Sequence, residues 1–172
     1  TPTRQSNDLT LFLQTEPRVF AATQPLPTQS GPRFVVAGDL DGTGRPDLAC
    51  TNFDSDSISL FFRDGTGAAV GSVIGSGGSS PIGVAIADLD DDGRSDLDDD
   101  GSVDILCIDP ANELVWAFVQ RAPLTFAARS PLLAHLQPVA IAASDLDGDG
   151  DTDIVTANSG SSNLTVRFGR SR

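Results

Sequence analysis

Aspartate-rich segments of nine residues recur along the chain with the spacing D-x-D-x-x-G-x-x-D. They read DLDGTGRPD from Asp39, DLDDDGRSD from Asp88, DLDDDGSVD from Asp96 and DLDGDGDTD from Asp145. A hard cation such as calcium takes six to eight oxygen ligands at about 2.3–2.6 Å. Side chains at positions 1, 3, 5 and 9, with the backbone carbonyl of position 7, can surround one such ion, and the glycine at position 6 permits the sharp bend.

The predicted metal ligands are the residues at positions 1, 3, 5, 7 and 9 of each segment. They are Asp39, Asp41, Thr43, Arg45, Asp47, Asp88, Asp90, Asp92, Arg94, Asp96, Asp98, Asp100, Ser102, Asp104, Asp145, Asp147, Asp149, Asp151 and Asp153. Two segments overlap at Asp96, so either one of them binds an ion and the other bulges outward, or two ions share Asp96. The expected cofactor is therefore Ca²⁺, with three or four ions per chain.

Two other kinds of chemistry fit these residues poorly. A helix-loop-helix calcium hand requires a glutamate at the twelfth loop position, where this chain has Cys50, Asp99, Cys107 or Thr156. The single histidine, His135, cannot supply a histidine-based triad or zinc site and is expected in a loop. Carboxylates that hold an ion are not available for acid–base work, so we expect no enzyme.

The acidity of the chain is local. The formal charge is −13, and 17 of the 24 acidic residues lie inside the aspartate segments, whereas 11 arginines are spread along the chain. This distribution indicates ion binding and disfavours nucleic acid as a partner. No apolar run is long enough to span a membrane. The chain has no lysine, methionine or tyrosine and only two glutamates, which favours an all-β protein. Its start without methionine indicates a processed, excised or recombinant segment.

The aspartate segments belong to a longer repeat. Asp39 to Asp88 and Asp96 to Asp145 both span 49 residues, with a local duplication between Asp88 and Asp96. A period of this size is typical of propellers and solenoids. Apolar runs precede each segment from Pro32, Pro81 and Pro138, and short strand-like runs follow it. The stretch Gly71–Ser80 is expected to be a loop between units rather than a domain boundary.

Each unit is predicted to hold four short antiparallel strands, which make one propeller blade. We interpret residues 1–172 as one domain: 1–30 hold strands 3 and 4 of a split blade, 31–80 a blade, 81–137 a blade with the duplicated loop, and 138–172 strands 1 to 3 of a split blade. The predicted fold is all-β, with about three and a quarter blades. Since a closed propeller needs at least four, the chain is either a partial propeller or is completed by oligomerisation.

The segments from Asp39 and Asp145, with the strands after them, resemble FG-GAP or VCBS repeats. Such repeats occur in integrin alpha-subunit heads, in some fungal and bacterial lectins and in secreted bacterial proteins. The resemblance implies a calcium-bearing β-propeller with its ions on one rim, where they organise the loops, and a secreted or cell-surface location. Thr43 replaces the usual Asp or Asn, which implies a weaker first site.

The expected function is that of a calcium-binding module for extracellular binding, adhesion or self-assembly. A carbohydrate-binding lectin is one alternative, with Asn52, Phe53, Asn112 and Asn158 as candidate contacts. A fragment of a larger secreted enzyme or receptor propeller is a second. Expected partners are further copies of the chain, or a protein or glycan on the rim opposite the calcium loops. That rim is predicted at 51–57, 109–113, 158–163, 23–33, 75–81 and 130–137.

Two further interpretations concern single residue types. Cys50 and Cys107 lie at the same place, three residues after Asp47 and Asp104, and repeat-equivalent positions are usually too far apart for a disulfide. We therefore expect buried free thiols. Trp116 is predicted to pack in the core, in the same strand phase as Leu60, Val166 and Leu11.

Overall fold

The computed structural model describes residues 6–63, 69–87, 104–122, 125–128 and 131–169. Within these ranges the chain forms antiparallel strands and one short 3-10 turn, η1 (Phe53–Ser55), with no α-helix. The predicted all-β class with four-stranded antiparallel sheets is therefore confirmed. No helix among the described residues is long and apolar enough to cross a membrane.

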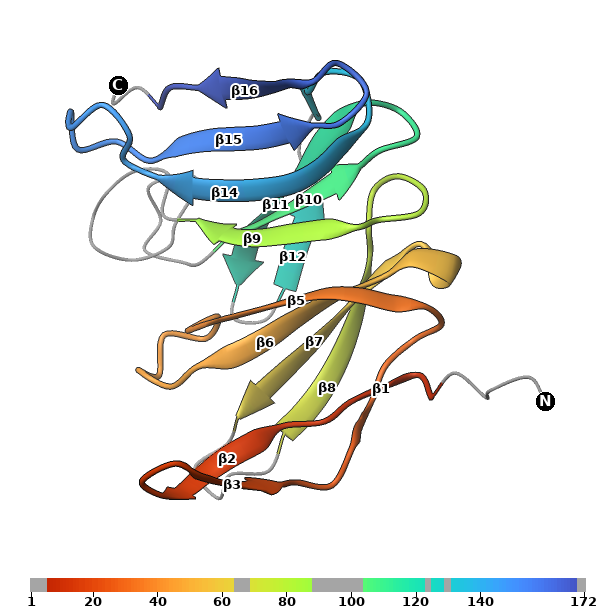
Figure 1. Cartoon of the computed structure of the whole chain (residues 1–172), viewed down its shortest axis with the longest axis vertical. Helices are drawn as coiled ribbons and strands as arrows, with labels where there is room; N and C mark the ends of the chain where they lie inside the picture. The colour runs from red at the N-terminus through yellow and green to blue at the C-terminus, as the bar shows by residue number, and fades with distance from the viewer. Residues whose placement is uncertain (1–5, 64–68, 88–103, 123–124, 129–130, 170–172) are drawn as a thin grey trace.

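Four sheets make up most of the molecule (Figure 1). We call them the N-terminal hairpin, the first blade, the second blade and the C-terminal blade. In that order they consist of β2 (Phe12–Glu16) and β3 (Val19–Ala22); β5 (Pro32–Gly38), β6 (Asp47–Asn52), β7 (Ser57–Arg63) and β8 (Ala69–Gly75); β9 (Gly83–Ala87), β10 (Asp104–Asp109), β11 (Leu114–Ala122) and β12 (Thr125–Ala128); and β14 (Pro138–Ser144), β15 (Asp153–Asn158) and β16 (Asn163–Arg167).

Short strands join these sheets at their margins. A two-residue pair, β1 (Asp8–Leu9) with β4 (Leu26–Pro27), flanks the N-terminal hairpin, and β13 (Leu132–Leu133) pairs with β11. The expected between-blade loop Gly71–Ser80 is only partly a loop, because β8 continues to Gly75 and pairs with β7 along its whole length. Sequence reasoning placed the end of this strand too early because glycine and serine are weak strand formers.

The sheets are stacked in chain order, with the N-terminal hairpin and the C-terminal blade at opposite ends (Figure 1). One apolar cluster joins the first and second blades and includes Leu60, Val84 and Ile105. A second cluster joins the second and C-terminal blades and includes Leu106, Val115 and Ile154. Each middle blade is thus stabilised by burial of its apolar faces. The described sheets form an open stack that does not close into a ring.

The strand register corrects one prediction about the core. Trp116 lies opposite Cys107, just as Ser59 lies opposite Cys50 and Thr165 opposite Thr156. It therefore shares a face with Ser59 and Thr165, and the predicted phase shared with Leu60, Val166 and Leu11 is wrong. The packing role itself is confirmed, because Trp116 is partly buried against the cluster between the first and second blades.

Turns on one side of the stack repeat from blade to blade. The residue before each strand-initiating proline, Gly31, Ser80 or Gln137, has a positive φ of 74°, 53° or 50°. At Gly31 a side chain is also excluded by space, since a Cβ would lie 2.6 Å from the Asp54 carboxylate. The same bend therefore delivers each chain segment into the first strand of the next blade.

Candidate metal site

The first aspartate loop, Asp39–Asp47, connects β5 to β6 and is held by its own carboxylates. The Asp39 carboxylate accepts hydrogen bonds from the backbone N–H groups of Thr43 at 3.0 Å and Gly44 at 2.6 Å. The Asp41 carboxylate accepts a second bond from Thr43 at 3.1 Å. Gly42 and Gly44 adopt positive φ values of 71° and 78°, so the backbone curls around the carboxylates.

The last aspartate loop, Asp145–Asp153, connects β14 to β15 in the same way. Asp145 accepts hydrogen bonds from the backbone N–H groups of Gly148 at 2.7 Å and Gly150 at 3.2 Å. The Asp147 carboxylate accepts the N–H of Asp149 at 3.2 Å. The first and third loop positions therefore shape both loops by the same kind of contact.

The ninth aspartate of each loop is a buried brace. The two Asp47 carboxylate oxygens accept the N–H of Leu40 at 3.0 Å and of Arg63 at 2.9 Å. Asp153 accepts the N–H of Leu146 and of Gly169, both at 2.8 Å. The brace therefore ties the start of the loop to the end of the third strand, and Asp47 and Asp153 have no exposed surface.

The duplicated loop ends in the same brace. Asp104 is fully buried, and its carboxylate accepts the N–H of Gln120 at 3.0 Å. The other predicted ligands of this loop, and with them the choice between one ion and two, lie outside the described residues. They are Asp88, Asp90, Asp92, Arg94, Asp96, Asp98, Asp100 and Ser102.

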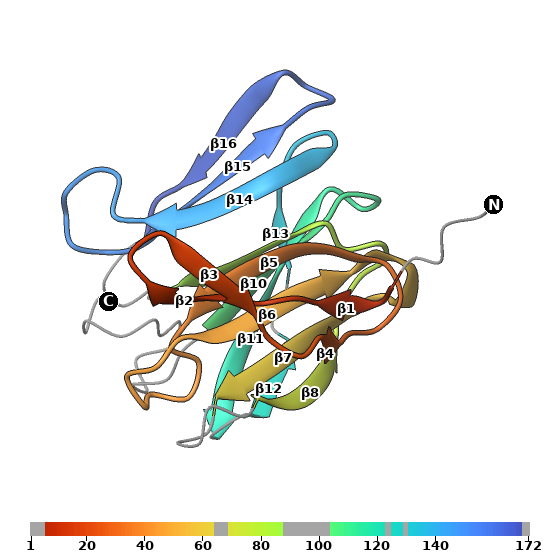
Figure 2. The same cartoon turned by 60° about the horizontal axis from the view of Figure 1, so that its bottom comes forward.

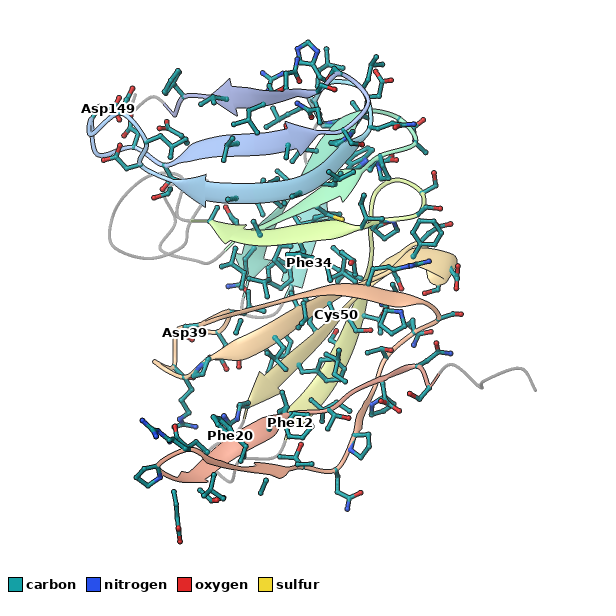
Figure 3. All side chains as sticks on the ribbon, viewed as in Figure 1. Phe12, Phe20, Phe34, Asp39, Cys50 and Asp149 are labelled. Atoms are coloured by element: carbon teal, nitrogen blue, oxygen red, sulfur yellow. The ribbon has the colours of Figure 1, made fainter. Side chains whose placement is uncertain are left out.

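Two groups of carboxylates could hold a metal ion. One oxygen from each of Asp39, Asp41 and Asp47 lies within 4.8 Å of the others, and a second such group joins Asp145, Asp147 and Asp149. Thr43 and Arg45 belong to the first loop, and Asp151 and Asp153 to the last, without being part of these groups. Asp39 and Asp149 lie on the same side of the stack (Figure 3).

The two groups suit a hard cation by donor chemistry, and their spacing allows an ion of the size of calcium. Two ligands on opposite sides of an ion that binds oxygen at about 2.3–2.6 Å lie about 4.6–5.2 Å apart, and the observed oxygens lie within 4.8 Å. Both groups consist of carboxylates alone, without histidine or sulfur, and such ligands favour hard cations. The described loops are therefore compatible with one ion each.

In each of the two described loops the pKa of one carboxyl group is raised, so its negatively charged form is less favourable than usual. Burial raises the pKa of Asp47 above its ordinary value, the N–H groups of Arg63 and Leu40 oppose this, and the charges of Asp41 and Asp39 add to it. Desolvation also raises the pKa of Asp147, and the charges of Asp149 and Asp153 increase it further. A bound cation would offset this repulsion in both loops.

The side of the stack opposite the loops carries turns whose asparagine side-chain N–H groups donate to neighbouring polar groups, although the buried Asn52 Oδ1 has no partner among the described residues. Asn52 is fully buried and donates to Ser57 and Ser59 at 3.1 and 2.9 Å. Asn158 is buried and donates to Asn163 and Thr165. These two candidate glycan contacts therefore serve their own turns.

The other two candidate glycan contacts and the cysteines are also placed. Asn112 donates to the Asp109 carboxylate at 2.8 Å, and Phe53 lies under the Arg33 guanidinium at 4.7 Å. Cys50 and Cys107 are free and buried, as predicted, and burial raises the pKa of their thiols to about 11 and about 12. His135 is exposed in the connection before β14.

Sequence reasoning missed the brace, because no common residue type marks its backbone donors. The backbone donor follows the ninth aspartate by 16 residues in all three repeats: Arg63 after Asp47, Gln120 after Asp104 and Gly169 after Asp153. The spacing of 16 residues is constant because the repeats have the same length up to this point. Since the donor is a backbone N–H, the side chain at that position can vary, and the sequence does not mark it.

Comparison with known proteins gives a family and a fold. The model of the FG-GAP-like repeat matches residues 39–97 and 96–156, which is more than half of the chain. No curated protein matches the sequence. The crystal structure of a functionally unknown protein from Desulfotomaculum acetoxidans DSM 771 is similar, with a TM-score of 0.57, 13% identity and an alignment covering 88% of this chain and 46% of that one. The chain thus spans less than half of that protein, and the likeness shows the fold alone.

Proposed function

The chain belongs to the FG-GAP-like repeat family, and from this premise we propose that it is a propeller-like module organised by calcium for extracellular binding or assembly. The observation that carries the proposal is the pair of carboxylate groups, each within 4.8 Å, at the same loop of two repeats. In the first loop Asp39, Asp41 and Asp47 would hold the ion, and in the last loop Asp145, Asp147 and Asp149. With the duplicated loop, three or four ions per chain are expected.

The proposed role of the ion is structural. Bound calcium would supply positive charge at carboxylates where desolvation, and to a lesser extent neighbouring negative charge, raises the pKa of Asp47 and Asp147. The chain's own residues do the remaining work: Asp39 and Asp145 curl the backbone, and Asp47 and Asp153 fix each loop to the third strand. We therefore assign the described loops to shaping one rim.

The binding surface is proposed on the opposite rim, and the location outside the cell follows from the family's usual occurrence. The rim consists of turns such as Phe53–Ser55 and 158–163, which are free of the ion-binding carboxylates. A protein or glycan ligand is expected there. The buried state of Asn52 and Asn158 gives no support to the glycan contacts predicted from sequence.

A second candidate function is a section of a larger secreted enzyme or receptor propeller. The similar solved structure is longer, since this chain covers 46% of it, and it supports a larger fold of this kind without indicating an activity. In that case calcium would play the same structural role, and the ligand would be determined by blades outside these 172 residues.

Thermal unfolding in calcium and in excess chelator tests the proposed function. In millimolar Ca²⁺ the melting temperature should rise over the chelated sample, since binding at a hundredfold excess over Kd contributes about 2.7 kcal/mol. Millimolar Mg²⁺ is the control and should stabilise less, because it demands a tighter octahedral shell. Equal melting temperatures in calcium and chelator would overturn the structural role of the ion.

A further inference from the structure

Large apolar side chains are exposed at both ends of the stack and buried in its middle. In the C-terminal blade, Leu164 is 66% exposed and Val166, which lies on the same face of β16, is 40% exposed. In the N-terminal hairpin, Phe12 is 65% exposed. By contrast, residues Ser57–Phe62 of β7 and all residues of β10 are buried. The exposed side chains therefore belong to the sheets that have a neighbouring blade on one face only.

The exposed face of the C-terminal blade repeats a face that is covered in the first blade. We call it the C-face. Its residues correspond, at the same distance from the loop aspartates, to four residues of the cluster between the first and second blades. The pairs are Leu146 (52% exposed) with Leu40 (0%), Leu164 (66%) with Ile58 (0%), Val166 (40%) with Leu60 (0%), and Phe168 (57%) with Phe62 (5%).

The first blade has the complementary face, on the side away from the second blade. Val35, Cys50, Ser59 and Val73 form a row across the first blade, because each pairs with the next in the strand register. In the second blade the same row contains Val84, Cys107 and Trp116 and packs against the first blade. Val35 is 47% exposed, whereas its equivalent Val84 is 1% exposed. We call the row ending in Val35 and Val73 the N-face.

We propose that the C-face of one copy packs on the N-face of a second copy, so that chains associate head to tail and repeat the contact between the first and second blades. The chain carries both halves of this contact, one on the first blade, where the N-terminal strands lie in front of it in Figure 2, and one on the C-terminal blade. A second copy therefore provides the missing half with the same spacing of apolar residues. The inner strands β14 and β15 lie against Val35 in this arrangement.

A second copy can reach the N-face only if the N-terminal hairpin is displaced from its position next to the first blade. Both ends of the chain carry a third strand, β2 and β16, so the junction holds one strand more than a blade of four. Every residue of β2 and β3 is exposed, and neither core cluster includes a residue of the hairpin. Its displacement therefore breaks no contact of the two core clusters. Cys50 and Ser59, in the middle of the N-face, are each only 1% exposed, so a second copy must also replace the contact of the following segment, in which the Gln29 N–H donates to Ser59 at 3.3 Å.

Such a contact is heterologous, because it joins two different faces. Variants that each disable one face can therefore distinguish it from a symmetric dimer, in which both copies use the same face. Val35→Asp disables the N-face and Leu164→Asp disables the C-face, each by burying an unpaired charge that should weaken association about a hundredfold or more. Light scattering coupled to size exclusion, in excess Ca²⁺, should show an assembly for the unaltered chain and monomers for each variant alone. An equimolar mixture should give a dimer, because each variant retains the face that the other lacks.

Controls separate this result from misfolding and from the calcium proposal. Leu133→Asp changes a side chain that is 66% exposed but lies on neither face, and it should assemble like the unaltered chain. Val73→Asp and Val166→Asp form a second complementary pair if either first variant fails to fold. A monomeric unaltered chain at high concentration, or a mixture that stays monomeric, would overturn the proposal. Calcium binding, measured separately on the same variants, should be unchanged, since neither face contains a loop carboxylate.

Discussion

The first loop, Asp39–Asp47, and the last loop, Asp145–Asp153, share a backbone frame and differ in charge. In both loops the first aspartate accepts two backbone N–H groups and the ninth is a buried brace. The first loop has three aspartates and one arginine, and the last has five aspartates. Thr43 takes the place of Asp149, and Arg45 that of Asp151.

The difference shows which positions fold the loop and which adjust the ion site. The frame is present without acidic residues at positions 5 and 7, so the aspartates at positions 1, 3 and 9 and the glycine at position 6, which both loops share, are enough to form it. Calcium affinity depends on the number of charged ligands, so the last loop should bind more tightly. The repeat can therefore vary ion affinity from blade to blade without changing the strand connection.

Removing a brace should cause the largest loss of stability, and the loss should be larger in the first loop, where Leu40 is buried, than in the last, where Leu146 is 52% exposed. Asp47→Ala leaves the buried N–H of Leu40 and the part-buried N–H of Arg63 unpaired, at a cost of up to about 1–3 kcal/mol each. Asp153→Ala leaves two part-buried N–H groups unpaired, which should cost less. Denaturant unfolding in excess chelator measures this cost without an ion contribution. Asp41→Ala, which loses a single hydrogen bond on the solvent side, is the control and should cost clearly less. A brace variant no worse than this control would contradict the shared frame.

Exchanging the residues at loop position 5 should raise the calcium affinity of the first loop and lower that of the last loop. Thr43→Asp adds a charged ligand to the first loop and should tighten its binding about tenfold, or about 1.4 kcal/mol. Asp149→Thr should weaken the last loop by a similar factor. Thr43→Asn supplies an oxygen without charge and should have a smaller effect. Calorimetric titration measures these changes. Calcium affinities that are the same in all three variants as in the unaltered chain would show that the number of charged ligands does not distinguish the loops.

Substituting the glycine at position 6 should cost about 1 kcal/mol in either loop. Gly44 and Gly150 have φ values of 78° and 97°, and a Cβ at Gly44 would meet no atom within 4 Å. The loss in Gly44→Ala would therefore come from backbone strain alone. Gly75→Ala, in a strand with equal free space, is the matched control and should be close to neutral. Urea unfolding of the three alanine variants decides this.

The residue three places after each loop gives the smallest expected difference. Cys50 follows the first loop and Thr156 the last. Burial raises the pKa of Cys50 from 9.0 to about 11, so the unfolded chain loses the thiol proton first as pH rises. Stability should therefore fall above pH 9, by about 1 kcal/mol at pH 10. Cys50→Thr, which copies the last repeat, should remove that part of the decline, and an unchanged alkaline profile would refute the shifted thiol.

Sequence reasoning recovered the features that depend on local pattern. The prolines at 32, 81 and 138 lie at or just before the first strand of each blade, because proline fixes a backbone angle that suits strand entry and the residue before it is restricted as well. The aspartate loops lie between the first and second strands, as their glycines and alternating oxygens require. Both features follow from a few neighbouring residues.

Features set by contacts between distant residues were missed or misplaced. Residues Leu114–Val119 are apolar at every position, because the second blade is covered on both faces, so alternation cannot reveal the phase of Trp116. Counting from Asp104 instead places Trp116 with Ser59. The brace was not predicted because its donors are backbone N–H groups that lie 16 residues after the ninth aspartate of each loop.

A calcium titration of the chelator-treated chain by calorimetry tests the central claim most directly. The account predicts saturable binding in at least two affinity classes, with the tighter class weakened by Asp149→Thr and unaffected by Thr43→Asp. The same titration with Mg²⁺ should give weaker binding. Absence of saturable heat at millimolar calcium would contradict the claim that the aspartate loops bind calcium, and a single class unaffected by either substitution would contradict the proposed difference between the loops.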